Sequence, residues 1–172
     1  MADALGTFYN GGKPGRRTAV TPKSLSANAA KRSIQRVISL GTGSVTTATY
    51  LVGIMPVKGK VVRIDFAGQA AVTGTSLTAD VRKLSSDGNT ATTLQSAATD
   101  IKLTASTDEV AQAASLTATV ANRTVDANLV LEVVITASSI TAGPGDLVVN
   151  VVYVPVEDSE SNNTIEIGAD LL

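Results

Sequence analysis

The chain has 172 residues, of which 44% are hydrophobic and 17% charged, enough for one domain with a buried core. It contains no histidine and no cysteine, which excludes imidazole and thiolate catalysis, disulfide bonds and thiolate zinc sites. The net charge of −1 conceals an asymmetry, because residues 1–36 hold seven basic residues and one acidic residue, whereas residues 155–172 hold five acidic residues and no basic one. Oppositely charged ends on a nearly neutral centre are typical of interaction tails. We expect neither a signal peptide nor a membrane span, since no apolar run is long enough for a span.

Residues 1–36 are predicted to form an extended basic arm. Pro14, Pro22 and the glycines around them are incompatible with a helix, and no strand alternation is present. Towards the end of the arm, apolar residues from Ala27 to Val37 recur every three or four positions. That spacing fits a short helix over residues 26–36, but the same stretch could equally be arm that runs into a first strand.

Strand signals recur from there to the end of the core, separated by turn signals such as the Asp-Gly step at 87–88. The predicted strands are 44–54, 60–66, 76–84, 92–96, 101–105, 114–121, 128–137 and 146–154. Period-2 alternation assigns an inward face to the stronger ones. The predicted inward residues are Val62, Ile64 and Phe66; Leu77, Ala79 and Val81; Leu129, Leu131, Val133 and Ile135; and Leu147, Val149, Val151 and Tyr153.

Eight short strands without intervening helical patterns predict an all-β fold, a single antiparallel β-sandwich over residues 37–155. We favour an eight-stranded jelly roll, with an immunoglobulin-type sandwich as the neighbouring option. Residues 156–172 then form an acidic C-terminal tail.

Candidate chemistry within the core is scarce. The adjacent acids Asp108 and Glu109 are interpreted as loop charges, and Asp87 and Asp100 lack the spacing of a calcium loop. We therefore predict no catalytic residues, no metal, no cofactor and no small-molecule substrate, and hence no enzyme.

Two hypotheses address the basic arm: electrostatic binding of nucleic acid, or a strap that lies over another protein. Seven basic residues over 36 positions are sparse for packaging a genome. They are interleaved with apolar residues, and Phe8-Tyr9 offers an aromatic anchor, which favours the protein strap.

Three runs carry a resemblance to a known family: KVVRIDFAGQAAVTGTSLTADVRKLSSDGNTATTLQS, ASLTATVA and NLVLEVVITASSITAGPGDLVVNVVYVP. Over residues 45–155 the chain resembles the small β-sandwich decoration, or cement, proteins encoded among the head genes of tailed bacteriophages. The resemblance implies a homotrimer on the outer surface of the major capsid protein lattice of a virion, made in the host cytoplasm. It also implies that the arm bridges neighbouring subunits and stabilises the DNA-filled head, without membrane or nucleic-acid partners. The expected capsid-contact residues are Phe8, Tyr9, Lys13, Arg16, Arg17, Lys23, Lys31 and Arg32.

Two other functions are compatible with the sequence. One is a jelly-roll coat protein of a small virus, with a basic arm that binds nucleic acid inside the shell. The other is a glycan-binding module of a tail or fibre, which the five aromatic residues of the chain disfavour.

Overall fold

The computed structural model describes residues 9–10, 13–14, 31–102 and 111–156. The chain divides into two units, residues 1–30 and a unit that begins at Lys31. In the first unit, β1 (Tyr9–Asn10) pairs antiparallel with β2 (Lys13–Pro14), so a minimal hairpin lies where the sequence predicted no strand. The second unit holds the sandwich.

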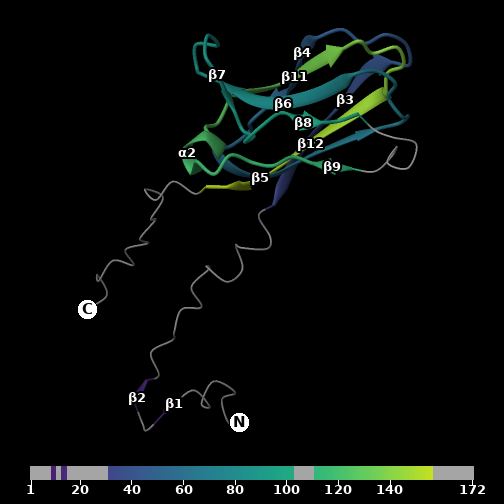
Figure 1. Ribbon diagram of the computed structural model, residues 1–172. Coiled ribbons are helices and arrows are strands. Elements are labelled where there is room, and N and C mark those ends of the chain that lie inside the picture. The colour runs from purple at the N-terminus through teal and green to yellow at the C-terminus, as the bar shows by residue number, and fades with distance from the viewer. Residues whose placement is uncertain (1–8, 11–12, 15–30, 103–110, 157–172) are drawn as a thin grey trace. The chain divides into compact units, whose positions relative to one another are not determined.

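Two antiparallel sheets face each other in the sandwich (Figure 1). The first sheet runs β3 (Arg32–Gly41), β12 (Gly145–Pro155), β5 (Gly59–Gly68), and then β9 (Gln112–Ala113) and β10 (Thr124–Val125), which both pair with β5. The second runs β4 (Ala48–Ile54), β11 (Val130–Ser138), β6 (Ser76–Leu84), and then β7 (Ala91–Thr93) and β8 (Thr99–Asp100), which both pair with β6. A short helix, α2 (Val120–Arg123), precedes β10.

The strand order confirms the predicted all-β jelly roll. The first and last long strands, β3 and β12, are neighbours, and the chain crosses repeatedly from one sheet to the other. If β7 with β8 and β9 with β10 are each counted as one broken strand, four strands form each sheet, as in a jelly roll.

The core lies between the sheets and follows the predicted alternation. Leu147, Val149, Val151 and Tyr153 of β12 are at most 2% exposed, and Leu77, Ala79 and Val81 of β6 are fully buried. Leu131, Val133 and Ile135 of β11 are also fully buried, and Leu129 packs partly against them. Burial of each large aliphatic side chain contributes about 1.5–3 kcal/mol, so these alternating faces are the main source of cohesion.

The predicted inward direction is wrong for one residue of β5. Val62 is 37% exposed, while Val61 is fully buried together with Ile64 and Phe66. The register between β12 and β5 shifts between Val152 and Tyr153, where one partner is Arg63 and the next is Val61. Val62 is therefore the extra residue of a β-bulge, which reverses the side-chain alternation at that point.

The boundary of the sandwich also differs from the prediction. β3 begins at Arg32, so residues 32–36 belong to the sandwich and are strand, not arm or helix. The helical option is thus wrong for residues 32–36, and residues 26–30 lie outside the described residues. The alternative, arm that runs into a first strand, is correct there.

The weaker predicted strands are broken into short pieces. Residues 44–47 precede β4, residues 101–102 follow β8, and residues 114–121 contain an isolated bridge at Leu116 and the start of α2. Between β7 and β8 the side chain of Gln95 replaces a backbone partner, because its Oε1 accepts a hydrogen bond from the Val81 amide at 2.6 Å. The periodicity of the sequence does not predict a strand pairing in which a side chain takes the place of a backbone acceptor.

The two long sides of the sandwich differ. On one, which we call the closed side (residues 91–102 and 111–125), backbone bonds join the two sheets: Ser96 donates to the Ser115 carbonyl at 2.8 Å and Thr117 to that of Leu94 at 3.0 Å. On the other, the open side, β3 and β4 are the edge strands, and among the described residues no ladder pairs them with each other. Side chains join them instead, since the side chain of Ile34 covers the backbone of Gly53.

Candidate functional site: the outer face of the first sheet

The two charged segments join the sandwich at neighbouring points. Arg32, the first residue of β3, lies opposite Tyr153 near the end of β12. Three residues later the Val156 amide donates to the Lys58 carbonyl at 3.0 Å, which fixes the last described residue beside β5. The basic arm and the acidic tail therefore attach to the same end of the first sheet.

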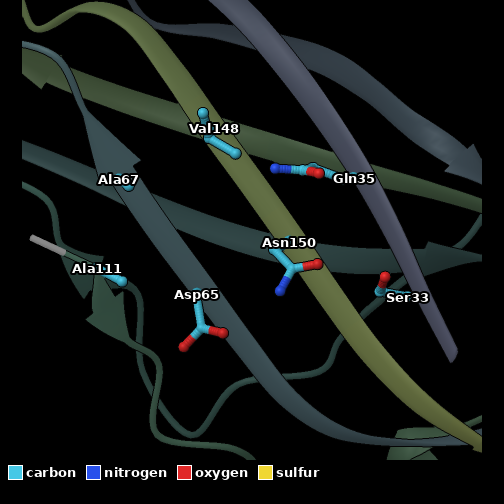
Figure 2. Close-up of a pocket in the computed structure, with 7 residues that line it drawn as sticks. All are labelled: Ser33, Gln35, Asp65, Ala67, Ala111, Val148 and Asn150. Carbon is cyan, nitrogen blue, oxygen red and sulfur yellow. The ribbon is translucent and has the colours of Figure 1, made fainter. Parts of the chain in front are cut away.

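A shallow hollow of about 360 Å³ lies on the outer face of this sheet (Figure 2). The strand register places Gln35, Asn150 and Asp65 side by side across β3, β12 and β5. Figure 2 shows Asn150 between the other two, with Val148 on one side of this polar row. The residues that line the hollow are Ser33, Gln35, Asp65, Ala67, Ala111, Val148 and Asn150.

Asp65 anchors one end of the polar row. It is only 8% exposed, and the Arg63 guanidinium Nε donates to its Oδ1 at 2.7 Å. Such a charge-assisted bond compensates a carboxylate for the loss of water. The amides of Gln35 and Asn150 can each donate and accept hydrogen bonds, so the row suits recognition of polar groups.

An apolar row runs beside the polar one. Val37, Val148 and Ala67 are register neighbours, and Val37 is 54% exposed. The two other most exposed large apolar residues of the described chain, Leu51 (54%) and Ile54 (56%), lie on β4. Exposed apolar surface of this kind is therefore concentrated on the open side, as in a surface that meets a partner.

The expected contact residues fall into two groups. Lys31 and Arg32 are exposed at the start of β3, and Tyr9 and Lys13 lie on the two strands of the hairpin. Phe8, Arg16, Arg17 and Lys23 lie outside the described residues. The hollow was not predicted from the sequence, although Asn150 is a usable signal, because it is the polar interruption of the apolar run LVVNVVYV.

Shifted ionisation occurs away from this face. Hydrogen bonds from the Ser85 hydroxyl and from the backbone and side-chain amides of Asn89 lower the pKa of Asp87 to about 2. Burial lowers the pKa of Lys83, and nearby Asp126 opposes that shift. Both groups have structural explanations, since Asp87 closes the Asp-Gly turn and Lys83 Nζ donates to the carbonyls of Ala121 (2.9 Å) and Thr124 (2.6 Å).

Within the described residues no cluster of three or more metal-ligating side chains occurs, and no helix there is long and apolar enough to cross a membrane. The face offers shape, hydrogen bonds and apolar contact, which are the means of binding a protein surface.

Comparisons with known proteins give little further definition. No family model matches the chain, and no curated protein matches it. Among solved structures, the chain is similar to one in the structure of infectious bursal disease virus Gx strain, with a TM-score of 0.35 and 16% identity. The match covers 76% of this chain and 38% of that chain, so this chain spans less than half the length of the other.

Proposed function

We propose that this chain is a structural, non-enzymatic protein of a virus particle that decorates the outer surface of a capsid. The sandwich sits on the major capsid protein lattice, and the basic arm extends from the start of β3 to fasten it to neighbouring subunits. The observation that carries the proposal is the attachment of the basic arm, at Arg32, beside a sheet face of mixed polar and apolar character.

The charge distribution supports a two-part contact. Lys13, Arg16, Arg17 and Lys23 precede the sandwich in sequence, while the hollow itself presents neutral amides and one compensated carboxylate. The arm thus supplies attraction to an acidic surface, and the sheet face supplies shape and hydrogen bonds. Because the two contacts are tethered, each can be weak while their combination is strong.

The resemblance over residues 45–155 adds the expectation of a homotrimer. A trimer would engage three lattice sites at once, so modest affinity at each site would suffice. The oligomeric state is part of the proposal and needs its own measurement by sedimentation velocity.

Cosedimentation with mature heads of the virus that encodes the chain tests the proposal. The full chain should bind saturably. A chain that starts at Lys31 should bind at least about tenfold more weakly while retaining the melting temperature of the sandwich, because β3 is intact. Removal of residues 1–36 would be a poorer test, since it would also remove the first half of the edge strand β3.

A charge variant separates attraction from length. With Lys13, Arg16, Arg17 and Lys23 all changed to Gln, the arm keeps its length and should still lose most of its affinity at low salt. Equal decoration by the truncated and full chains would disprove the role of the arm.

The coat-protein alternative predicts a different behaviour of the purified protein. The protein alone would assemble into closed shells visible by electron microscopy and would bind nucleic acid with a steep salt dependence. Under the decoration proposal, the purified protein forms no closed shells, and its binding to heads does not require nucleic acid as a partner.

A further inference from the structure

The free edge of β3 lacks a partner among the described residues. This ten-residue strand pairs only with β12, so one row of its backbone donors and acceptors faces away from the sheet. Natural proteins usually shorten, charge or cover such an edge, because it otherwise pairs with another chain. The charges on this one are Lys31, Arg32 and Arg36, all exposed, and none of them has an ion pair within the described part of the chain.

The two arginines share one face of β3. Arg32 and Arg36 are four residues apart, and their register partners on β12, Tyr153 and Val149, both point into the core. The opposite face carries Ser33, Gln35 and Val37, of which Ser33 and Gln35 line the hollow. An added strand that matches this edge needs two acids four residues apart on one face and an apolar residue beside Val37 on the other.

The acidic tail has that pattern. In the stretch TIEIGADLL, residues 164–172, Glu166 and Asp170 are four residues apart, and Ile165, Ile167 and Leu171 occupy the alternate positions. Placing Glu166 beside Arg32 also places Asp170 beside Arg36. The same offset brings Leu171 beside Val37, whose side chain is 54% exposed.

The chain is long enough to reach its own edge. The tail leaves β12 next to the start of β3, so a strand added there would run parallel to β3. It must cross two strand spacings, about 10 Å, whereas the nine residues 157–165 can span up to ~30 Å. A linker of that length gives an effective concentration on the order of millimolar.

We propose that residues 164–172 of this chain add to the free edge of its own β3 as a parallel strand, with Glu166 and Asp170 paired to Arg32 and Arg36. The tail then covers the edge and prevents pairing with other chains. This inference is independent of the proposed capsid role, because it concerns contacts within one chain.

The absence of cysteine makes a direct test available. The variant Q35C/A169C places two thiols at the proposed register, and T49C/A169C is the matched control, with its first cysteine on an exposed position of the other edge strand, β4. Under oxidised glutathione, Q35C/A169C should form an intramolecular disulfide at least about tenfold faster than the control. Equal rates, no disulfide, or a disulfide-linked dimer on non-reducing gels would overturn the proposal.

Charge reversal tests the pairing itself. R36E in the Q35C/A169C background should slow disulfide formation several-fold, and adding D170R should restore it. Failure of the second change to restore the rate would contradict the register.

Deletion of residues 1–30 distinguishes the edge from the arm as the partner of the tail. If the tail binds β3, the disulfide forms at the same rate without the arm; if the rate falls to that of the control pair, the tail binds the arm and the proposal is wrong. Hydrogen exchange gives a readout without cysteine: removal of residues 157–172 should accelerate exchange in β3 and leave β4 unchanged.

Discussion

On the closed side of the sandwich, short strands from both sheets meet and share backbone hydrogen bonds around residues 94–96 and 115–117. On the open side, two longer strands, β3 and β4, end their sheets without such a junction and carry Val37, Leu51 and Ile54 at the surface. The closed side satisfies backbone polar groups of both sheets through these bonds, although Nε of Arg123 is buried there without a hydrogen-bond partner among the described residues. The open side exposes apolar side chains, and the basic arm joins the sandwich there at the start of β3. Under the proposed function, the closed side stabilises the sandwich and the open side meets the partner.

The largest expected effect is the difference in the free energy of unfolding between substitutions at two glutamines. Gln95, 1% exposed, accepts from the Val81 amide and donates through Nε2 to Thr99 Oγ1 at 2.7 Å. Gln95→Ala leaves that amide unsatisfied and creates a cavity, so we expect a loss of about 2–4 kcal/mol in the free energy of unfolding. Gln35→Ala on the exposed face should change it by less than about 0.5 kcal/mol. Urea denaturation of both variants measures the contrast, and similar losses would contradict it.

A smaller effect concerns how the open side is held together. A Cβ at Gly53 would lie 2.7 Å from Cγ2 of Ile34, so Gly53→Ala should cost about 1–2 kcal/mol. Gly43→Ala, where a Cβ meets nothing within 4 Å, is the control and should be neutral or slightly stabilising. Combining Gly53→Ala with Ile34→Ala should cost less than the sum of the two single changes. Full additivity would show that β3 and β4 do not pack through this contact.

A third comparison uses lysines. Lys83→Ala removes two hydrogen bonds that fasten β6 to the segment around α2, and should cost about 1 kcal/mol. Lys31→Ala, at the exposed start of β3, should stay within about 0.5 kcal/mol. Thermal melts at neutral pH check both, and an equal effect would mean that Lys83 is not a structural tie.

The smallest effect lies in the Asp-Gly turn that precedes β7. Because hydrogen bonds to the carboxylate lower the pKa of Asp87 to about 2, its contribution to stability is present above the ordinary value of 3.8 and is lost as the pH falls towards 2. Carboxyl NMR titration should give a midpoint near 2, and Ser85→Ala should raise it, since the Ser85 hydroxyl is the largest cause of the shift. A midpoint near the ordinary value would refute this turn geometry.

The sequence predicted the interior well, and the sides poorly, for a physical reason. Long strands such as β6 and β12 bury one face, so their apolar residues alternate with polar ones or with outward-facing ones in the sequence. In β6 the buried residues Leu77, Ala79 and Val81 show this period-2 pattern. The closed side depends on the side chain of Gln95 and on a single bridge at Leu116, neither of which has a periodic signature. The bulge at Val62 is likewise invisible to alternation.

The candidate site was predicted only in part. Charge counting identified the arm and tail, but their attachment beside each other required the register of Arg32 with Tyr153. The polar row across three strands could not be assembled without knowing that β12 lies between β3 and β5.

The division between a stabilising side and an interacting side is tested most directly by hydrogen exchange of the full chain, free and bound to heads of its virus. We predict that binding slows exchange in the arm and on the outer face of β3, β12 and β5, and leaves residues 91–102 and 114–125 unchanged. Protection confined to that closed side, or an arm that exchanges equally fast in both states, would contradict it.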